Sequence, residues 1–186
     1  MVNNIIGGDA NTLHDVAAAF AASQAAQGVS YTEVRYDPVR AAVSNYTRAT
    51  ISQEAAVAAV SAGLRAGAEQ HGIAVFSLLC AMRGKPPSAC DAVADLAASV
   101  RSQELGGVVG LDLAGDELDF NNTTPFDYVP CFRRAKKVLG LNTTGEVPRA
   151  KANTTNDVLT AVEQMHADRI GHGYAAIASP EALASL

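Results

Sequence analysis

The chain has 186 residues, of which 48% are hydrophobic and 18% are charged, and its net charge is −5, a composition typical of one globular domain with a sizeable core. The mild acidity and the lack of a basic stripe exclude a nucleic-acid-binding protein, and no apolar run reaches the roughly 18 residues that a membrane span needs. We therefore predict a single domain over residues 1–186, with neither nucleic acid nor a membrane span.

The first half of the chain alternates helices with strands. Alanine-rich residues 9–27 carry apolar side chains at helical spacing, with Asn11 or Thr12 as the expected N-cap. Residues 29–38 are rich in β-formers and predict a strand. A second helix over residues 52–70 leads into an apolar run at residues 73–80, which is typical of a buried strand.

The second half continues the alternation. A helix is expected from Ser88 or Asp91 to about Glu104, and a buried strand follows from Val108. The remaining predicted elements are a helix over 125–139, a strand over 141–146, a helix over about 156–166, a strand over 168–174 and a helix from 179.

This order, a helix followed by five strands that each precede a helix, predicts a parallel sheet. A repeat of about 35 residues suits either a (β/α)₈ barrel or a doubly wound sheet. No GxGxxG or GxxxxGK[ST] turn occurs, which disfavours the doubly wound alternative. Polar residues gather where the strands end, which is the barrel pattern. They lie at Glu33 and Arg35, in the pair Met82-Arg83, within residues 112–117, at Glu146 and at His172.

The stretch Val108–Glu117 holds the strongest candidate site. It begins as a buried strand and ends in Gly115 between acidic residues. A glycine there lets the backbone approach a ligand closely, although an ordinary exit from a strand has the same appearance. Gly115 is therefore a candidate binding residue.

Three scattered cysteines, Cys80, Cys90 and Cys131, form no CxxC motif. We expect free thiols and a reducing compartment, such as the cytoplasm, with Cys80 buried and inert. The first residues lack the basic start of a secretory signal. N-x-T sequons therefore carry little weight at this stage. They lie at Asn45, Asn121, Asn122, Asn142 and Asn153.

Four segments in order and spacing resemble motifs of the adenosine deaminase family. They are residues 31–38 (YTEVRYDP), 77–83 (SLLCAMR), 108–117 (VVGLDLAGDE) and 169–174 (RIGHGY). That family consists of zinc-dependent (β/α)₈ hydrolases that convert adenosine to inosine. The resemblance implies a partial (β/α)₈ TIM barrel covering roughly strands 2 to 6, with the first and last strands missing.

The resemblance also implies roles for three residues. Gly115 would place its backbone amide against a ring nitrogen of the purine. Glu146 would protonate the purine ring, and His172 would hold the attacking water. Zn²⁺ in the complete enzyme would lower the pKa of that water to about 7, while attack at C6 needs a proton delivered to the ring by a carboxylic acid.

This sequence departs from the family at the zinc ligands. The His-x-His pair of the first strand and the two Asp residues of the eighth are absent, and the His-Ala-Gly-Glu motif appears as Thr143-Thr144-Gly145-Glu146. Either Thr143 replaces the ligand His, or three residues are lost before Gly145. We favour the loss, which would draw Glu146 back by about 10 Å at about 3.3 Å per residue.

These departures lead to three hypotheses. We expect this chain alone to bind no zinc and to need another protein chain, or the missing part of the barrel, to cover its open sheet edges. The first hypothesis is part of an adenosine deaminase that acts on purine nucleosides. The alternative is a catalytically dead, truncated deaminase domain serving as a structural subunit. A purine-binding module that retains Gly115 without catalysis is the third.

Overall fold

The computed structural model describes residues 6–115, 125–146, 158–184 and 186. They belong to two compact units. Unit 1 comprises residues 1–79 and 100–109, and unit 2 comprises residues 80–99 and 110–186. The single-domain assignment of residues 1–186 stays a prediction.

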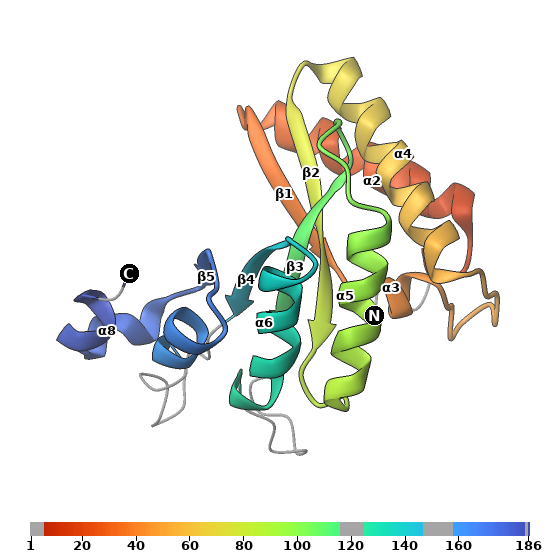
Figure 1. Cartoon of the computed structure of the whole chain (residues 1–186). Helices are drawn as coiled ribbons and strands as arrows, with labels where there is room; N and C mark the ends of the chain where they lie inside the picture. Colours follow the sequence, from red (N-terminus) through yellow and green to blue (C-terminus); the bar gives the residue numbers. More distant parts are fainter. Residues whose placement is uncertain (1–5, 116–124, 147–157, 185) are drawn as a thin grey trace. The chain divides into compact units, whose positions relative to one another are not determined.

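The described strands form one sheet (Figure 1). They are β1 (Tyr31–Tyr36), β2 (Ala74–Met82), β3 (Val108–Ala114), β4 (Asn142–Glu146) and β5 (Arg169–Gly171). The helical elements are α2 (Ala10–Ala26), α3 (Pro38–Ala41), α4 (Gln53–His71), α5 (Pro87–Ser99), η1 (Pro125–Tyr128), α6 (Val129–Lys137), η2 (Thr160–Gln164), η3 (Tyr174–Ala178) and α8 (Pro180–Ala184).

The order of strands in the sheet is β1-β2-β3-β4-β5, the same as their order in the chain. The pairs β1–β2, β3–β4 and β4–β5 are parallel. A doubly wound sheet would reverse its strand order at a switch point, and no reversal occurs among the described strands. The predicted partial (β/α)₈ barrel is therefore confirmed. No helix in the described ranges is long and apolar enough to cross a membrane.

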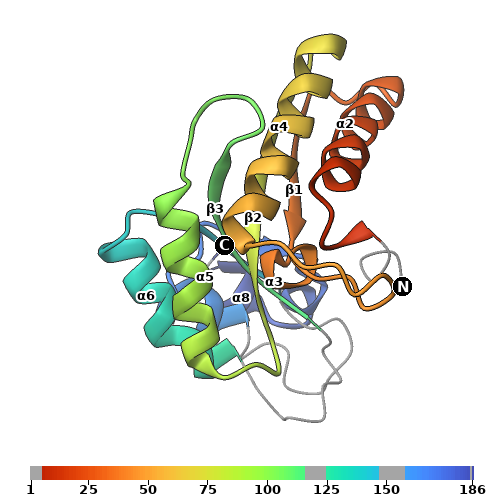
Figure 2. The ribbon, with the colours of Figure 1, turned by 90° about the vertical axis from the view of Figure 1, so that its right-hand side faces the viewer.

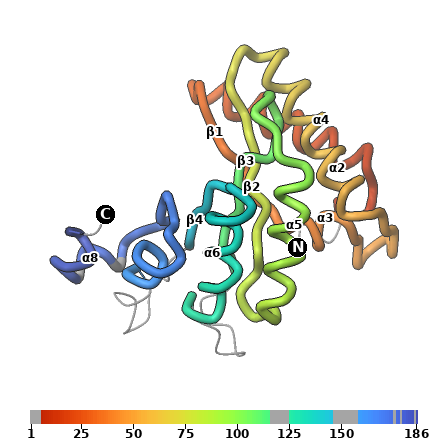
Figure 3. Tube along the Cα trace, viewed as in Figure 1, coloured from red at the N-terminus to blue at the C-terminus, as the bar shows by residue number. Residues whose placement is uncertain are grey.

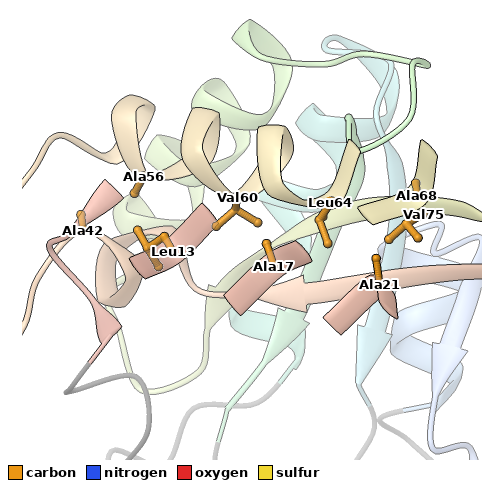
Figure 4. Close-up of a cluster of buried hydrophobic side chains, with 9 residues drawn as sticks. All are labelled: Leu13, Ala17, Ala21, Ala42, Ala56, Val60, Leu64, Ala68 and Val75. Carbon is orange, nitrogen blue, oxygen red and sulfur yellow. The ribbon is translucent and has the colours of Figure 1, made fainter. Parts of the chain in front are cut away.

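In unit 1, α2 and α4 lie side by side (Figures 1 and 2). Gly63 and Gly67 of α4 allow this close approach, because a Cβ at Gly63 would stand 2.1 Å from the carbonyl oxygen of His14 and one at Gly67 would stand 2.6 Å from Ala21 Cβ. Small and branched side chains between the helices and the strands form the core of this unit (Figure 4). They are Leu13, Ala17, Ala21, Ala42, Ala56, Val60, Leu64, Ala68 and Val75.

Helix ends in unit 1 follow local signals. Ser52, the first residue of the second predicted helix, is the N-cap of α4, and its hydroxyl accepts from the Ala55 amide. The predicted cap of α2 at Asn11 or Thr12 is wrong, since Asp9 is the N-cap and accepts from the Thr12 amide at 2.7 Å. That backbone hydrogen bond lowers the pKa of Asp9, because it favours the ionised carboxyl.

The third predicted helix ends early. The prediction runs to about Glu104, whereas α5 ends at Ser99. The backbone after Ser99 is paired with the start of β3 instead, because Arg101 forms a parallel bridge with Val108 and the Ser102 amide donates to the Val108 carbonyl at 3.0 Å. Pairing with the start of β3 outweighs helix propensity at this point.

In unit 2, α5 and α6 lie side by side (Figures 2 and 3) and are joined by a disulfide between Cys90 and Cys131. The prediction of free thiols is therefore wrong for these two buried cysteines. The two cysteines are 41 residues apart in the chain, and their pairing depends on the two helices being neighbours. The sequence alone does not show that the helices are neighbours. Cys80 is a free thiol and is buried as expected. The expectation of a reducing compartment loses the support that it drew from Cys90 and Cys131.

Later elements are shorter than predicted. The helix expected over residues 125–139 is divided into the 3₁₀ turn η1 and α6. Tyr128 at this junction is buried and donates to the Lys85 carbonyl at 2.9 Å. The expected start of the next helix, at residues 156–157, lies outside the described residues, and the π-helical turn η2 occupies part of its range.

Candidate functional site

The three predicted site residues lie at the carboxyl ends of neighbouring strands in unit 2. Gly115 directly follows β3, Glu146 is the last residue of β4, and His172 directly follows β5. Leu113 pairs with Gly145, and Glu146 pairs with Gly171. Because carboxyl ends of parallel strands share one edge of the sheet, this register brings the three positions to the same edge.

Gly115 packs against the backbone of Arg83, a contact that the sequence did not predict. Its φ is +128°, and an added Cβ would stand 3.0 Å from the Arg83 nitrogen. The Arg83 amide donates to the Ala114 carbonyl at 2.7 Å, and the Arg83 residue is only 6% exposed. The close approach of the Arg83 backbone is thus a structural reason for glycine here, beside the expected approach of a ligand. Asp116 and Glu117 lie outside the described residues.

Glu146 ends a continuous β4. One residue before it, Gly145 pairs with Leu113, so the backbone of Glu146 is level with Ala114 at the end of β3. Thr143 is buried, and its amide donates to Asp168 at 2.9 Å while its hydroxyl donates to the His166 carbonyl at 3.3 Å. The choice between a replaced His and a loss of three residues stays a prediction.

A buried polar cluster links three strands of unit 2. Asp112 of β3 has no exposed surface. Its carboxylate accepts hydrogen bonds from the Thr144 hydroxyl of β4 and, at 3.6 Å, from the Cys80 thiol of β2. A buried carboxylate needs such donors to compensate for lost hydration. In the sequence Asp112 stands close to the acidic residues of the turn, whereas the register Asp112–Thr144 places it among buried partners.

His172 has an unusual backbone. Its φ is +63°, a conformation that few residues other than glycine adopt and in which His is enriched. The side chain is exposed, and its ring lies parallel to that of Tyr174 with centroids 6.4 Å apart. Backbone strain of this kind often marks functional positions, so the geometry of His172 is compatible with its predicted role.

The described residues do not supply enough ligands for a metal ion. No group of three or more His, Cys, Asp or Glu side chains there could hold a metal ion. A catalytic zinc site needs three protein ligands at fixed geometry. The zinc of a complete family enzyme would therefore need donors from outside the described residues. That this chain alone binds no zinc stays a prediction.

A separate cavity of about 220 Å³ lies within unit 1, where α2, α4 and β1 line it. Its walls are mostly apolar and include Leu13, Phe20 and Tyr36. None of the three predicted site residues lines this cavity. It offers no pairing of an acid with a His, so we do not assign the chemistry to it.

Comparison with known proteins identifies the family. The family model for adenosine deaminase matches residues 2–186. The adenosine deaminase of Enterococcus faecalis is 38% identical over 165 residues, which cover 88% of this chain and 44% of that protein. The adenosine deaminase of Bos taurus is 32% identical over 176 residues, covering 91% of this chain and 47% of that protein. The chain spans about half the length of the curated relatives it matches.

Solved structures agree in fold. A zinc-bound amidohydrolase from Burkholderia ambifaria superposes with a TM-score of 0.79 at 25% identity, covering 95% of this chain and 45% of that chain. An adenine deaminase from Arthrobacter aurescens gives a TM-score of 0.77 at 19% identity, covering 95% of this chain and 50% of that chain. Since the family model matches nearly the whole sequence, this chain belongs to the adenosine deaminase family.

Proposed function

We propose that the protein containing this chain is a zinc-dependent hydrolase that converts adenosine to inosine, and that this chain supplies the purine-facing and proton-transferring part of the site. One observation carries the proposal. In a chain of the adenosine deaminase family, the register of β3, β4 and β5 brings Gly115, Glu146 and His172 to adjacent strand ends.

Each residue has a chemical task in this reaction. The Gly115 amide faces a ring nitrogen of the purine and orients it. Water adds at C6, and Glu146 delivers a proton to the ring so that the added negative charge is neutralised. His172 holds the attacking water by a hydrogen bond and takes up its proton as the C6–O bond forms. That proton passes to the exocyclic amino group, the C6–N bond breaks to release ammonia, and the hydroxyl proton of the adduct returns to Glu146 as the carbonyl forms. The zinc donors would come from elsewhere in the protein, because the described residues hold no suitable group.

The test uses the whole native protein. Zinc content and inosine formation are measured for the wild type, for Glu146→Gln and for the matched control Glu163→Gln, which changes an exposed side chain of η2. We expect Glu146→Gln to retain zinc and to lose turnover by about 10²-fold or more, the usual loss on removing a general acid. Glu163→Gln should keep both properties. Full turnover in Glu146→Gln would refute the role of Glu146.

A second candidate function is a structural subunit without catalysis. It is favoured by Thr143 and Thr144 before Gly145-Glu146, where the family has His-Ala, and by the lack of a three-donor group among the described residues. It predicts a native chain near 19.2 kDa that copurifies with a partner protein and has neither zinc nor turnover. Zinc and inosine formation in the native protein would exclude it.

The purine-binding module makes a different prediction. Adenosine would bind to the native protein without being converted, and Gly115→Ala would weaken that binding. Equilibrium dialysis with labelled adenosine, followed by analysis of the recovered nucleoside, separates this behaviour from both other candidates. Recovery of inosine would support the enzyme, and no retention of adenosine would support the structural subunit.

A further inference from the structure

The disulfide of unit 2 indicates the kind of compartment in which the chain folds. Cys90 of α5 and Cys131 of α6 are both buried, and their bond joins two helices 41 residues apart in sequence. Forming it transfers two electrons, with two protons, from the thiols to an oxidant that itself bears a disulfide and is reduced to a dithiol. Such bonds form and persist in oxidising compartments and are rare in the cytosol.

The distribution of asparagines points to the same surroundings. Five of the nine asparagines of the chain are followed by Thr two positions later, and this N-x-T pattern is the acceptor for N-linked glycans in secreted proteins. In a reducing compartment the N-x-T sites would receive no glycan. In an oxidising compartment, the exposure of each asparagine determines whether it carries a glycan, because the modification needs an accessible surface site.

Asn45 has the geometry of such a site. It lies with Tyr46 and Thr47 in an exposed turn of unit 1, in which Tyr46 is 79% exposed. The backbone of the turn is closed by the Ser44 amide, which donates to the Ala49 carbonyl at 2.9 Å. The Thr47 amide in turn donates to the Ser44 hydroxyl at 3.0 Å. The turn therefore presents the whole sequon to solvent on a defined backbone.

Asn142 provides a contrast within the same chain. Its sequon lies inside strand β4, and Thr144 is buried and donates to the carboxylate of Asp112. Asn142 itself is exposed, but a sequon whose threonine is committed to the interior of the sheet is not accessible as a whole in the folded protein. The other three sequons, at Asn121, Asn122 and Asn153, lie outside the described residues.

We propose that this protein folds in an oxidising compartment and carries an N-linked glycan on Asn45. In the modification, an oligosaccharide attached to a lipid pyrophosphate is the donor. The Asn45 side-chain nitrogen forms a bond to the anomeric carbon of the sugar, the bond from that carbon to the pyrophosphate oxygen breaks, and the amide proton leaves to solvent. The proposal replaces the expectation of a reducing compartment and does not depend on deaminase activity.

Mass spectrometry of the native protein, isolated from the cells that make it, tests the glycan directly. Trypsin releases residues 41–48 (AAVSNYTR) and 138–149 (VLGLNTTGEVPR) as separate peptides. Enzymatic removal of N-glycans in heavy-oxygen water converts a modified Asn to labelled Asp. We expect the label at Asn45 and unmodified Asn142. Unmodified Asn45 in the native protein would overturn the proposal.

Two further measurements test the sequon and the disulfide separately. In the full-length protein expressed in the same cells, Thr47→Ala should abolish the glycan and the associated shift in gel mobility, whereas Thr47→Ser preserves the sequon and should keep both. Alkylation of the denatured native protein should label Cys80 without reduction, and Cys90 and Cys131 only after reduction. Labelling of Cys90 and Cys131 without reduction would refute the oxidising compartment.

Discussion

Gly115 and Arg83 are in close backbone contact, and a Cβ at Gly115 would require Arg83 to shift. A Cβ at Gly115 would stand 3.0 Å from the Arg83 nitrogen and 3.1 Å from Arg83 Cβ. The neighbouring hydrogen bond from the Arg83 amide to the Ala114 carbonyl, at 2.7 Å, fastens the end of β3 to the residue that follows β2. The turn proposed to face the purine is thus positioned by the strand beside it.

Gly115→Ala is expected to destabilise the folded protein by about 1–3 kcal/mol, the cost of a residue forced into an unfavourable backbone region. The close contact with Arg83 adds to that cost, because the backbone of Arg83, which donates a hydrogen bond to Ala114, would have to shift to admit the methyl group. Urea unfolding followed by circular dichroism measures the change.

The control for this variant is Gly72→Ala. Gly72 also has a positive φ, +67°, but an added Cβ there would meet nothing within 4 Å. We expect a smaller loss, about 1 kcal/mol, from the backbone conformation alone. Equal losses in the two variants would mean that the contact with Arg83 is not the cause.

Sequence reasoning was accurate where the determining signal is local. The helix predicted over residues 52–70 corresponds closely to α4, because the capping residues Ser52 and Gly72 each act on backbone groups at the adjacent end of the helix. It was inaccurate where segments far apart in the chain compete. The Cys90–Cys131 disulfide joins cysteines 41 residues apart, which only the packing of α5 beside α6 brings together. The early end of α5 has a nearer cause, the pairing of Arg101 with Val108.

The same distinction applies to the candidate site. The edge positions of Gly115, Glu146 and His172 could be predicted, because each lies at the end of its own predicted strand and parallel strands end at a shared edge. The cluster around Asp112 could not be predicted, since its partners come from two other strands and are selected by the register. A single shift of register would have turned Thr144 away from Asp112.

Thr144→Val tests the contribution of that cluster. Valine keeps the shape of threonine but removes the hydroxyl that donates to Asp112, so a buried carboxylate loses a donor. We expect a loss of about 1.5–3 kcal/mol, the usual value for hydrogen bonds to charged groups. Thr144→Ser retains the hydroxyl and is expected to lose less. Denaturant unfolding of both variants gives the comparison, and equal stability of Thr144→Val and the wild type would contradict the prediction.

The disulfide is expected to stabilise unit 2 through the unfolded state. Closing a loop across the 41-residue separation of Cys90 and Cys131 corresponds to about 4 kcal/mol in the chain-entropy model. The double variant Cys90→Ala/Cys131→Ala should therefore unfold at markedly lower urea concentration than the oxidised wild type. A reductant should lower the stability of the wild type while leaving the variant unchanged. Insensitivity of the wild type to complete reduction would show that the bond contributes no stability.

Asp168 predicts a specific dependence of stability on pH. Burial alone would raise the pKa of its carboxyl, but hydrogen bonds from the Lys136 ammonium and the Thr143 amide outweigh burial and lower it. A carboxyl whose pKa is lower in the folded state contributes stability fully above its unfolded pKa of about 3.9, and that stability is lost as the pH falls through the folded pKa.

Asp168→Asn is therefore expected to cost about 1 kcal/mol at pH 7, a modest value because the pair with Lys136 is partly exposed. The difference from the wild type should stay constant down to about pH 4 and should shrink below it. Added salt should reduce the difference at pH 7, since it screens the ion pair. Urea unfolding across pH 3–7 at two salt concentrations measures both trends, with Glu163→Gln as a control that removes one exposed negative charge. A difference that persists unchanged to pH 3 would show that the loss comes from packing and not from the charge of Asp168.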